Sequence, residues 1–486
     1  MADVSPSATT HGNGHATPDD AIEQVFRAQQ AHRPVMRATD ATQRRAKIER
    51  LRRAVLDRRD DIRDALYADF KKAPEEVDLT EIKVVAEFAS FAEKNLDDWM
   101  APERVGTPFT FIGTRSEIHY EPKGVALIIS PWNYPINLTF GPLIAALAAG
   151  NCAILKPSEF TPHASRLMHE MVTELFDERE VALFEGDKTV AQTLLDQPFD
   201  HIYFTGSPAV GKIVMKAAAE HLASVTLELG GKSPAIVDDT ADVLDAAGKI
   251  AWGKFTNVGQ TCIAPDYVLV HDRAYDLLVD ALRHNIRRFY GASEADRRST
   301  PDYARIVNTK HYERLQHLYA DALEAGAAVI DGGDMDPEQQ YVAPTLLADV
   351  PPHAAIMQEE IFGPLLPIVR YRTLDEALNR INQLPNPLAL YLFTESDAIE
   401  QAVLNRTTAG TTAINDALLQ FFNPNLPFGG VGHSGMGKGN GYFGFKEFSN
   451  ERAVLRRTTG SAIIKQLYPP YGTKSRKVID WLVKYL

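Results

Sequence analysis

The sequence predicts an α/β fold built on parallel sheets and divided into two or three domains. A chain of 486 residues is too long to fold around a single hydrophobic core. From residue 125 onward, short runs that are apolar throughout alternate with helical segments. Such runs are typical of strands buried on both faces, and their alternation with helices indicates parallel sheets covered on both sides.

The first two expected strands are residues 125–129 and 152–155, and helices follow them at about 137–149 and 162–176. A glycine, Gly150, ends the first of these helices. The pattern continues with expected strands at 181–184, 201–204, 224–227, 235–237, 267–270, 368–371 and 389–393. Further helices are expected at about 242–254, 273–290 and 374–382.

Before residue 125, the sequence does not show this alternation of apolar runs and helical segments. Residues 1–19 are rich in small and polar residues, so we expect a disordered leader. Residues 20–100 follow helical periodicity. Residues 108–120 alternate around a turn at 112–114, which predicts a β-hairpin.

Composition excludes several classes of function. The chain is 45% hydrophobic and 24% charged, as in soluble globular enzymes, and its net charge of −13 disfavours nucleic acid as a partner. Two cysteines cannot build a disulfide framework, which fits a reducing cytosol. Neither a run of about 18 apolar residues nor a secretory signal is apparent, so the expected location is cytoplasmic.

One of the two cysteines, Cys262, ends the segment 257–262 (Asn-Val-Gly-Gln-Thr-Cys) between an expected helix ending near residue 255 and the next strand. A thiol in a glycine-containing connection is held in place but stays reachable, as a nucleophile must be. The alternative is an inert buried cysteine, which is common for unpaired cysteines. The other cysteine, Cys152, lies within an apolar strand and is expected to be core.

Polar or glycine-rich segments follow several of the expected strands, where parallel sheets bind their ligands. They are Ser130-Pro131-Trp132-Asn133, Lys156-Pro157-Ser158-Glu159, residues 205–212 and Glu228-Leu229-Gly230-Gly231-Lys232. Their shared position at strand ends points to one binding site.

The segment from Gly206 to Gly211 opens a helix near Ser207 and fits two common phosphate motifs imperfectly. Pro208 breaks the dinucleotide pattern, and Ile213 replaces the hydroxyl residue that would hold magnesium. Backbone N–H groups at a helix start still suit a pyrophosphate. Lys156 and Glu159 suit ribose hydroxyls, and a carboxylate there favours NAD, with NADP as the alternative.

Three later segments stand out by their composition. Residues 359–364 form a loop with two carboxylates beside an aromatic ring, which could equally be a solvated acidic turn. Residues 423–444 are rich in glycine and are expected to be irregular. The tail 458–486 is basic and ends in an amphipathic segment. Docking of this tail on protein is favoured, and peripheral contact with a membrane is the alternative.

Five motifs in this order resemble the aldehyde dehydrogenase superfamily over about residues 20–457. They are Phe204-Thr205-Gly206-Ser207, Glu228-Leu229-Gly230-Gly231-Lys232-Ser233-Pro234, Gly259-Gln260-Thr261-Cys262, Glu359-Glu360-Ile361-Phe362-Gly363-Pro364 and Pro427-Phe428-Gly429-Gly430. The compact N-terminus and Tyr468-Pro469-Pro470-Tyr471 resemble the class 3 branch, which includes fatty-aldehyde and aromatic-aldehyde enzymes.

The resemblance implies NAD(P)-dependent oxidation of aldehydes to carboxylic acids. It implies that Cys262 is the nucleophile, Glu228 the general base and the Asn133 amide part of the oxyanion hole. The implied cofactor contacts are Lys156, Glu159, Gly206, Ser207, Gly211, Leu229, Glu360 and Phe362.

The resemblance also implies a division into domains. A Rossmann-type NAD-binding domain comprises residues 20–100 and 121–228, and the catalytic domain comprises residues 229–412. A small β element for bridging and oligomerisation, formed by residues 101–120 and 413–457, implies a homodimer.

Two alternatives stay open. In an acylating dehydrogenase, coenzyme A rather than water takes the acyl group, but a carboxylate at Glu228 favours hydrolysis. An inactive relative with a structural or binding role has no need of Cys262, Glu228 and Asn133 together. No cluster has metal-ligand spacing, so no metal is expected. Aromatic residues near Tyr134, Trp252, Phe255 and 418–422 favour medium- or long-chain apolar or aromatic aldehydes.

Overall fold

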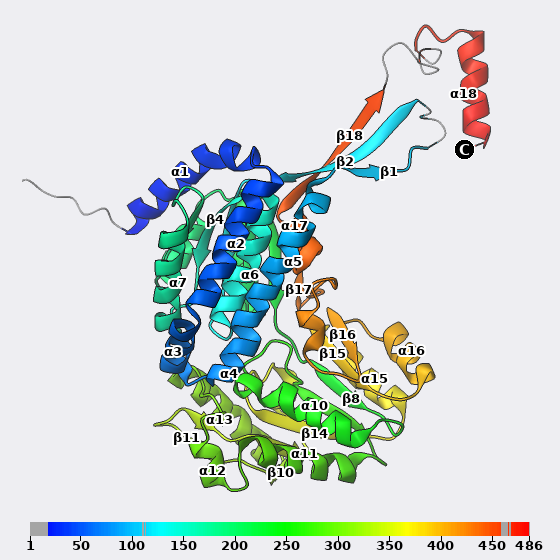
Figure 1. The fold of residues 1–486 in the computed structure, drawn as a ribbon. Helices are drawn as coiled ribbons and strands as arrows, with labels where there is room; N and C mark the ends of the chain where they lie inside the picture. Colours follow the sequence, from blue (N-terminus) through cyan, green and yellow to red (C-terminus); the bar gives the residue numbers. More distant parts are fainter. Residues whose placement is uncertain (1–17, 109–110, 112, 458–464, 466–467, 486) are drawn as a thin grey trace, which may run out of the picture.

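The computed structural model describes residues 18–108, 111, 113–457, 465 and 468–485. Two α/β bodies carry a long β arm, and the C-terminal helix lies beyond the tip of that arm (Figure 1). Of the expected leader, only Pro18 and Asp19 are described, at the start of the first helix; the rest lies outside the described residues. No helix of the described part is long and apolar enough to cross a membrane.

The first body is a six-stranded sheet, parallel except for one edge strand, β17. Across the sheet the strands are β17 (Gly435–Met436), β7 (Ser224–Leu229), β6 (His201–Gly206), β3 (Val125–Ile129), β4 (Cys152–Lys156) and β5 (Val181–Leu183). The chain order reverses between β3 and β6, which makes the carboxyl ends of these two strands the point where a ligand is expected. The five parallel strands are those that their apolar runs predict, with ends shifted by two residues or fewer.

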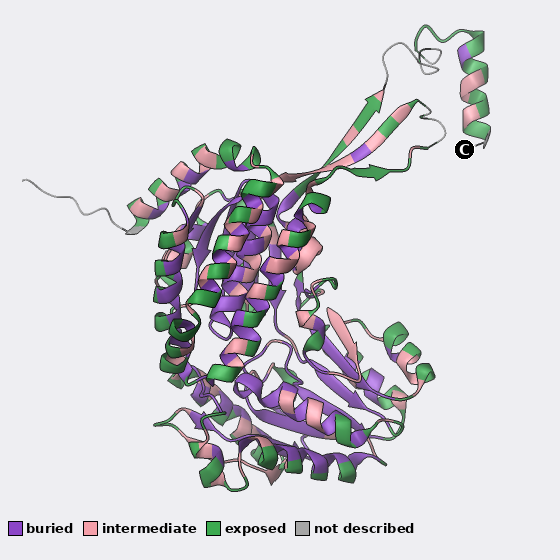
Figure 2. Ribbon diagram, in the orientation of Figure 1, coloured by how far each residue is buried: buried purple, intermediate pink, exposed green. Residues whose placement is uncertain are grey.

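Helices cover both faces of this sheet. They are α1 (Pro18–Arg37), α2 (Ala41–Asp57), α3 (Arg59–Phe70), α4 (Pro74–Val77), η1 (Asp78–Ile82), α5 (Lys83–Met100), α6 (Pro135–Ala149), α7 (Pro162–Leu175), α8 (Lys188–Leu195), α9 (Pro208–Glu220) and α17 (Gly441–Glu447). Helix α6 ends at Gly150, whose φ of 88° permits the left-handed C-cap. The sheet interior is buried, while the helices expose their outer faces (Figure 2).

The second body is a seven-stranded sheet, parallel except for β10. Its strands are, in order, β10 (Ala328–Asp331), β13 (Thr345–Ala348), β14 (Leu365–Tyr371), β9 (Tyr267–His271), β8 (Pro234–Val237), β15 (Ala389–Phe393) and β16 (Thr411–Ile414). Its helices are α10 (Val243–Phe255), η3 (Thr256–Gly259), α11 (Tyr275–Tyr290), α12 (Glu294–Ser299), α13 (Thr309–Glu324), α14 (Ala355–Gln358), α15 (Leu374–Asn382), α16 (Asp397–Arg406) and η4 (Leu419–Phe422). A small hairpin pairs β11 (Met335–Asp336) with β12 (Tyr341–Val342).

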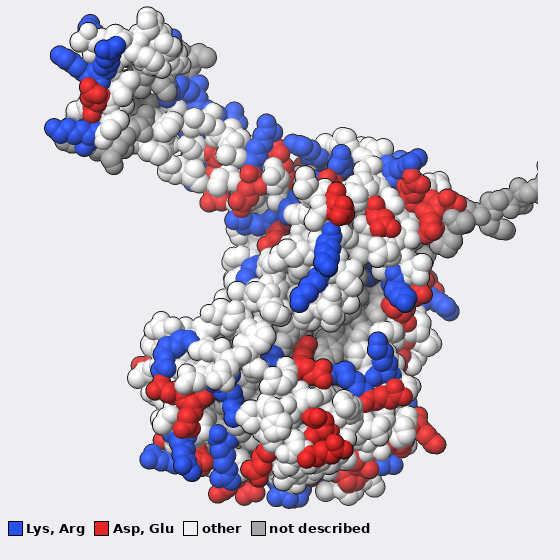
Figure 3. Space-filling view, turned by 180° about the vertical axis from the view of Figure 1, so that it is seen from behind, with Lys and Arg blue, Asp and Glu red and all other residues white. Residues whose placement is uncertain are grey.

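The arm is a three-stranded antiparallel sheet of β1 (Glu103–Val105), β2 (Thr114–Pro122) and β18 (Ser449–Arg457). β1 and β2 form a hairpin, as expected, but its first strand lies at residues 103–105, before the expected range of 108–120. Residues 109, 110 and 112 lie outside the described residues. Most arm residues are exposed or half-buried (Figure 2). Basic side chains gather on α18 (Thr473–Tyr485) beyond the arm (Figure 3).

Candidate active site

Three consecutive left-handed residues place the loop that carries Cys262. After α10, Asn257, Val258 and Gly259 have φ angles of 53°, 55° and 72°. This conformation is unfavourable for a β-branched residue such as Val258, at a cost on the order of 1–3 kcal/mol. Strain of this kind persists only where the surroundings enforce it, and here it turns the chain so that Cys262 faces a cavity.

Side chains of the loop itself hold it in this shape. Gln260 is buried; its amide Nε2 donates to the carbonyl of Arg305 (3.1 Å), and its Oε1 accepts from the N–H of Val307 (3.0 Å). Thr261 Oγ1 and the Tyr134 hydroxyl are hydrogen-bonded at 2.7 Å. The cysteine therefore stands on a backbone whose preceding residues are fixed by contacts with distant parts of the chain.

The surroundings of the Cys262 thiol favour its protonated form. Burial, followed by the nearby carboxylates Glu360 and Glu228, raises its pKa to about 12, whereas the backbone N–H groups of Cys262 and Ile263 act in the opposite direction. A proton must therefore leave the sulfur before or during attack on a carbon. Cys152, by contrast, is fully buried in β4 and does not line either cavity at the site.

Glu228 supplies a buried carboxyl group close to this thiol. It lies near the end of β7, and its Oε2 has no hydrogen-bond partner, while Oε1 accepts a long hydrogen bond of 3.5 Å from the Tyr203 hydroxyl. Burial raises the pKa of Glu228 well above its ordinary value; the Lys438 ammonium acts in the opposite direction, and Glu447 adds to the rise. A carboxyl group with these properties suits proton transfer near neutral pH.

Asn133 is fixed directly onto the cysteine loop. It follows β3, and its amide Nδ2 donates to the carbonyl of Gln260 at 3.0 Å. In return, its backbone carbonyl accepts from Asn257 Nδ2 at 2.9 Å. An amide nitrogen carries two N–H bonds, so a second donor is still available to a ligand oxygen.

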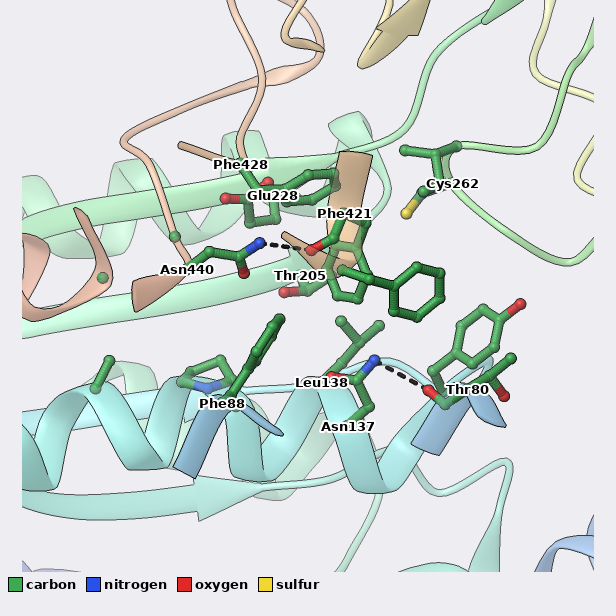
Figure 4. A pocket seen from close by; sticks show the side chains of 18 of the residues that line it. Thr80, Phe88, Asn137, Leu138, Thr205, Glu228, Cys262, Phe421, Phe428 and Asn440 are labelled. Carbon is green, nitrogen blue, oxygen red and sulfur yellow. Dashed lines mark hydrogen bonds between the residues drawn. The ribbon is translucent and has the colours of Figure 1, made fainter. Parts of the chain in front are cut away.

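Two cavities meet at the cysteine. Thr205, Glu228 and Cys262 line both of them. The first, about 90 Å³, is mostly apolar and runs between α5, α6 and the glycine-rich segment. Figure 4 shows Cys262 and Glu228 on one side of it and Phe88, Asn137 and Leu138 opposite. Of the aromatic residues expected here, Tyr134, Trp252, Phe421 and Phe422 line the cavity, whereas Phe255 is absent from the lining and packs near Tyr290.

The second cavity, about 340 Å³, lies at the carboxyl ends of β3 and β6. Four of the expected cofactor residues line it: Gly206, Ser207, Glu360 and Phe362. Ser207 also caps α9, its Oγ accepting from the N–H of Val210 at 3.4 Å. The Glu360 Oε1 is buried without a hydrogen-bond partner, and burial raises the pKa of this carboxyl group to about 8. An unpartnered oxygen at a cavity wall fits a ligand hydroxyl.

The other four expected cofactor residues lie outside this lining. Lys156 is buried; its Nζ donates to the carbonyl of Pro157 and lies 3.8 Å from Glu159 Oε2, and Glu159 is exposed. Gly211 packs against Leu229: a Cβ added to Gly211 would lie 2.8 Å from Leu229 Cδ2. The structure thus places the first pair at the end of β4 and the second pair between helix α9 and strand β7.

Sequence reasoning missed His311 and Arg314, which line the second cavity, and it named Trp132 only as part of a segment. Trp132 belongs to a strand-end segment, so its position was a usable signal. His311 and Arg314 lie on α13, and their helical spacing does not distinguish them from an ordinary amphipathic face. Among the described residues, no group of three or more His, Cys, Asp or Glu side chains is placed to hold a metal ion.

Comparison with known proteins identifies this arrangement. The sequence profile of the aldehyde dehydrogenase family matches residues 3–454. The chain belongs to the aldehyde dehydrogenase family. It is accordingly an oxidoreductase of the NAD(P)-dependent type that oxidises aldehydes.

Curated relatives within the family agree with the class 3 resemblance. The 4,4'-diaponeurosporen-aldehyde dehydrogenase of Staphylococcus aureus is 45% identical over 457 residues, which cover 94% of this chain and 98% of the relative. Aldehyde dehydrogenase family 3 member B2 of Mus musculus is 43% identical over 441 residues, 90% of each chain. A solved structure of the substrate-bound state of Staphylococcus aureus AldH is 44% identical. It covers 95% of this chain and 99% of its own, with a TM-score of 0.90.

Proposed function

We propose that this aldehyde dehydrogenase oxidises medium- to long-chain aliphatic or aromatic aldehydes, with Cys262 as nucleophile and Glu228 as general base. The observation that carries the proposal is the meeting of two cavities at these two side chains: the apolar cavity and the second cavity at the carboxyl ends of β3 and β6. Among the described residues, Glu228 is the one Asp, Glu, Lys or Arg side chain in the lining of the apolar cavity. Burying apolar chain carbons there is favourable, while a charged substrate tail would lose its hydration without a partner.

In the first step, the Cys262 sulfur bonds to the aldehyde carbon and the thiol proton passes to solvent water. The carbonyl oxygen becomes an oxyanion, and the second N–H of Asn133, with the backbone N–H of Cys262, would stabilise it. The bound nicotinamide cofactor supplies an acceptor for the hydride. Loss of that hydride from the carbon bonded to Cys262 leaves a thioester on the sulfur.

In the second step, Glu228 takes a proton from water, and the resulting hydroxide attacks the thioester carbon. The carbon–sulfur bond breaks and the carboxylic acid leaves. The departing sulfur takes the proton from Glu228, which restores both the Cys262 thiol and the Glu228 carboxylate. The unpartnered Oε2 of Glu228 supports this role, because it is a free acceptor in a buried position.

The cofactor residues are assigned by their place around the second cavity. Gly206 and Ser207 at the start of α9 would face the pyrophosphate, and Glu360 with Phe362 would hold the nicotinamide half. Lys156 and Glu159 at the end of β4 would meet the adenosine ribose, and the contact of Gly211 with Leu229 would set how closely α9 approaches β7. The proposed NAD-binding domain comprises residues 20–100 and 121–228. The Glu159 carboxylate, exposed at that sheet edge, favours NAD over NADP.

A single set of assays tests the substrate and cofactor proposals together. We expect NADH formation without coenzyme A, with a lower kcat/KM for NADP than for NAD. We also expect kcat/KM to rise as the aldehyde chain lengthens from two carbons until the chain fills the apolar cavity. Each buried CH₂ is worth about 0.8 kcal/mol, roughly a fourfold rise in kcat/KM. Higher kcat/KM for short polar aldehydes would contradict the substrate class. Turnover that begins only when coenzyme A is added would favour the acylating reaction.

The arm and tail support the proposal of a homodimer. Val105 and Leu455 are exposed on the arm, at 38% and 58%, and Trp481 and Val483 are exposed on α18, at 54% and 77%. Covering such side chains with a second copy would remove apolar surface from water. We expect light scattering to give a mass twice that of the chain. A monomer, or a tail that binds anionic vesicles instead, would contradict this assignment.

Two free cysteines suit a cytoplasmic location.

A further inference from the structure

Arg314 of α13 is hydrogen-bonded to the backbone of the segment that carries Glu360 and Phe362. Its Nη1 donates to the carbonyl of Glu360 at 3.2 Å, and its Nη2 donates to the carbonyls of Ile361 and Phe362 at 2.6 and 3.5 Å. Three consecutive carbonyls thus converge on one guanidinium. A planar group with five N–H bonds in a fixed fork can serve three acceptors at once, which a lysine ammonium on a flexible stem cannot reproduce.

A buried ion pair holds the same segment from the other side. Lys232 and Asp266 are paired, and the Lys232 Nζ also donates to the carbonyl of Glu359 at 3.0 Å. Asp266 Oδ1 accepts from the N–H of Ile361 at 3.0 Å. Lys232 belongs to one of the five family motifs but has no place in the chemistry proposed above. The contacts of Lys232 show that it anchors the backbone of residues 359–361.

The segment needs these anchors because its conformation is unfavourable. Phe362 has a φ of 47°, in the left-handed region, which a bulky aromatic residue rarely adopts. Its ring lies edge-to-face on Trp132, with centroids 5.3 Å apart. Losing the three carbonyl contacts removes part of the support for this conformation and lets the ring shift relative to Trp132.

Close packing leaves the segment little space. A Cβ on Gly363 would lie 2.3 Å from the side chain of Leu315, the neighbour of Arg314 on α13. A Cβ on Gly259 would lie 2.4 Å from the Gly363 carbonyl, so the cysteine loop touches the other side. The segment is therefore held between α13 and the loop that ends in Cys262.

We propose that Arg314 is a positioning residue for the cofactor: it fixes the backbone of residues 360–362 so that Glu360 and Phe362 face the nicotinamide half. The inference rests on the roles proposed above for Glu360 and Phe362. It predicts that losing the guanidinium fork weakens cofactor binding and hydride transfer while the reactivity of the cysteine itself is kept. A lysine at position 314, which keeps the positive charge but not the fork, is not expected to restore cofactor binding.

The test compares Arg314→Gln and Arg314→Lys with Lys310→Gln, which removes an exposed positive charge from the same helix. Two quantities are measured: the Kd for NAD, by titration of protein fluorescence, and the cofactor-free hydrolysis of p-nitrophenyl acetate, which needs Cys262 but no hydride transfer. We expect both Arg314 variants to raise the Kd for NAD about tenfold or more, because small displacements of a positioned group are costly. In the two Arg314 variants, the rate of ester hydrolysis falls less than about threefold. In Lys310→Gln, neither the Kd for NAD nor the rate of ester hydrolysis changes.

Three outcomes overturn the inference. A Kd unchanged in Arg314→Gln shows that the fork is dispensable. Normal binding by Arg314→Lys together with a loss in Arg314→Gln shows that only the charge matters, as in a direct contact with the cofactor. Equal loss of NAD binding and ester hydrolysis shows general damage to the site. A wild-type protein that binds NAD in an Arg314-dependent way but oxidises no aldehyde would refute the proposed function and leave this inference standing.

Discussion

Replacing Cys262 with alanine should abolish NADH formation from every aldehyde, by at least ~10⁴-fold in kcat, because no covalent intermediate can form. No neighbouring thiol can substitute, since the chain has only one other cysteine and Cys152 is buried in β4. The measurement is steady-state NADH absorbance at saturating NAD and aldehyde, with circular dichroism to show that the fold is intact.

The second cysteine provides the matched control. Cys152→Ala should keep kcat within about twofold and lose only some stability from a small cavity, on the order of 1 kcal/mol. Loss of activity in Cys152→Ala with activity retained in Cys262→Ala would reverse the assignment of the nucleophile. Similar activity in both variants would mean that the reaction does not pass through a thioester.

Replacing Glu228 with glutamine should separate the two halves of the reaction. Formation of the thioester does not require a base at the hydrolytic water, so the first turnover still releases about one NADH per active site. Hydrolysis then slows by ~10²–10⁴-fold, the usual contribution of a positioned general base. Stopped-flow absorbance would show a burst of NADH followed by a nearly flat steady state.

The pH dependence of kcat gives an independent check on the role of Glu228 as general base. Its pKa is raised well above the ordinary carboxylate value, mainly by burial, so the protonated form predominates at low pH and cannot act as a base. Wherever hydrolysis limits the rate, kcat of the wild type should rise with pH as Glu228 ionises. Glu228→Gln should lose this rise. A variant with no burst and an unchanged pH profile would remove Glu228 from the hydrolytic step.

The sheet strands and the residues at their ends could be predicted from the sequence because both signals are local. A run such as Val125–Ile129 is apolar throughout, and this is sufficient to indicate a strand buried on both faces. In a parallel sheet, all such strands deliver their carboxyl ends to one edge, so the order of strands and helices alone suggests that Asn133 and Ser207 share a site. Cys262 was conspicuous through its glycine-containing connection and the scarcity of cysteine.

The apolar cavity and Arg314 could not be predicted in the same way. Phe88 and Leu138 line the cavity, yet their spacing on α5 and α6 is that of any core-facing helical residue. Arg314 gains its importance from carbonyls about 46 positions later in the chain. Strands β10 and β13 and helices α12 and α13 were also missed, because the region from 291 to 350 lacks long apolar runs. Side chains whose role depends on distant backbone leave no local pattern.

During synthesis of the chain, strand β2 is complete long before its partner β18. Pro122 pairs with Ser449, 449 − 122 = 327 positions later, so the two strands emerge from the ribosome far apart in time. At roughly 5–20 residues per second, β2 waits on the order of 20–60 s for its partner. During that interval its backbone N–H and C=O groups have only short β1 beside them.

An unpaired strand is a template for incorrect pairing with other chains. Strand β2 carries three charged side chains: Arg115, Glu117 and Glu121. When the same strand of two nascent chains meets in parallel and in register, like charges face one another and repel. This repulsion protects the strand until β18 is synthesised.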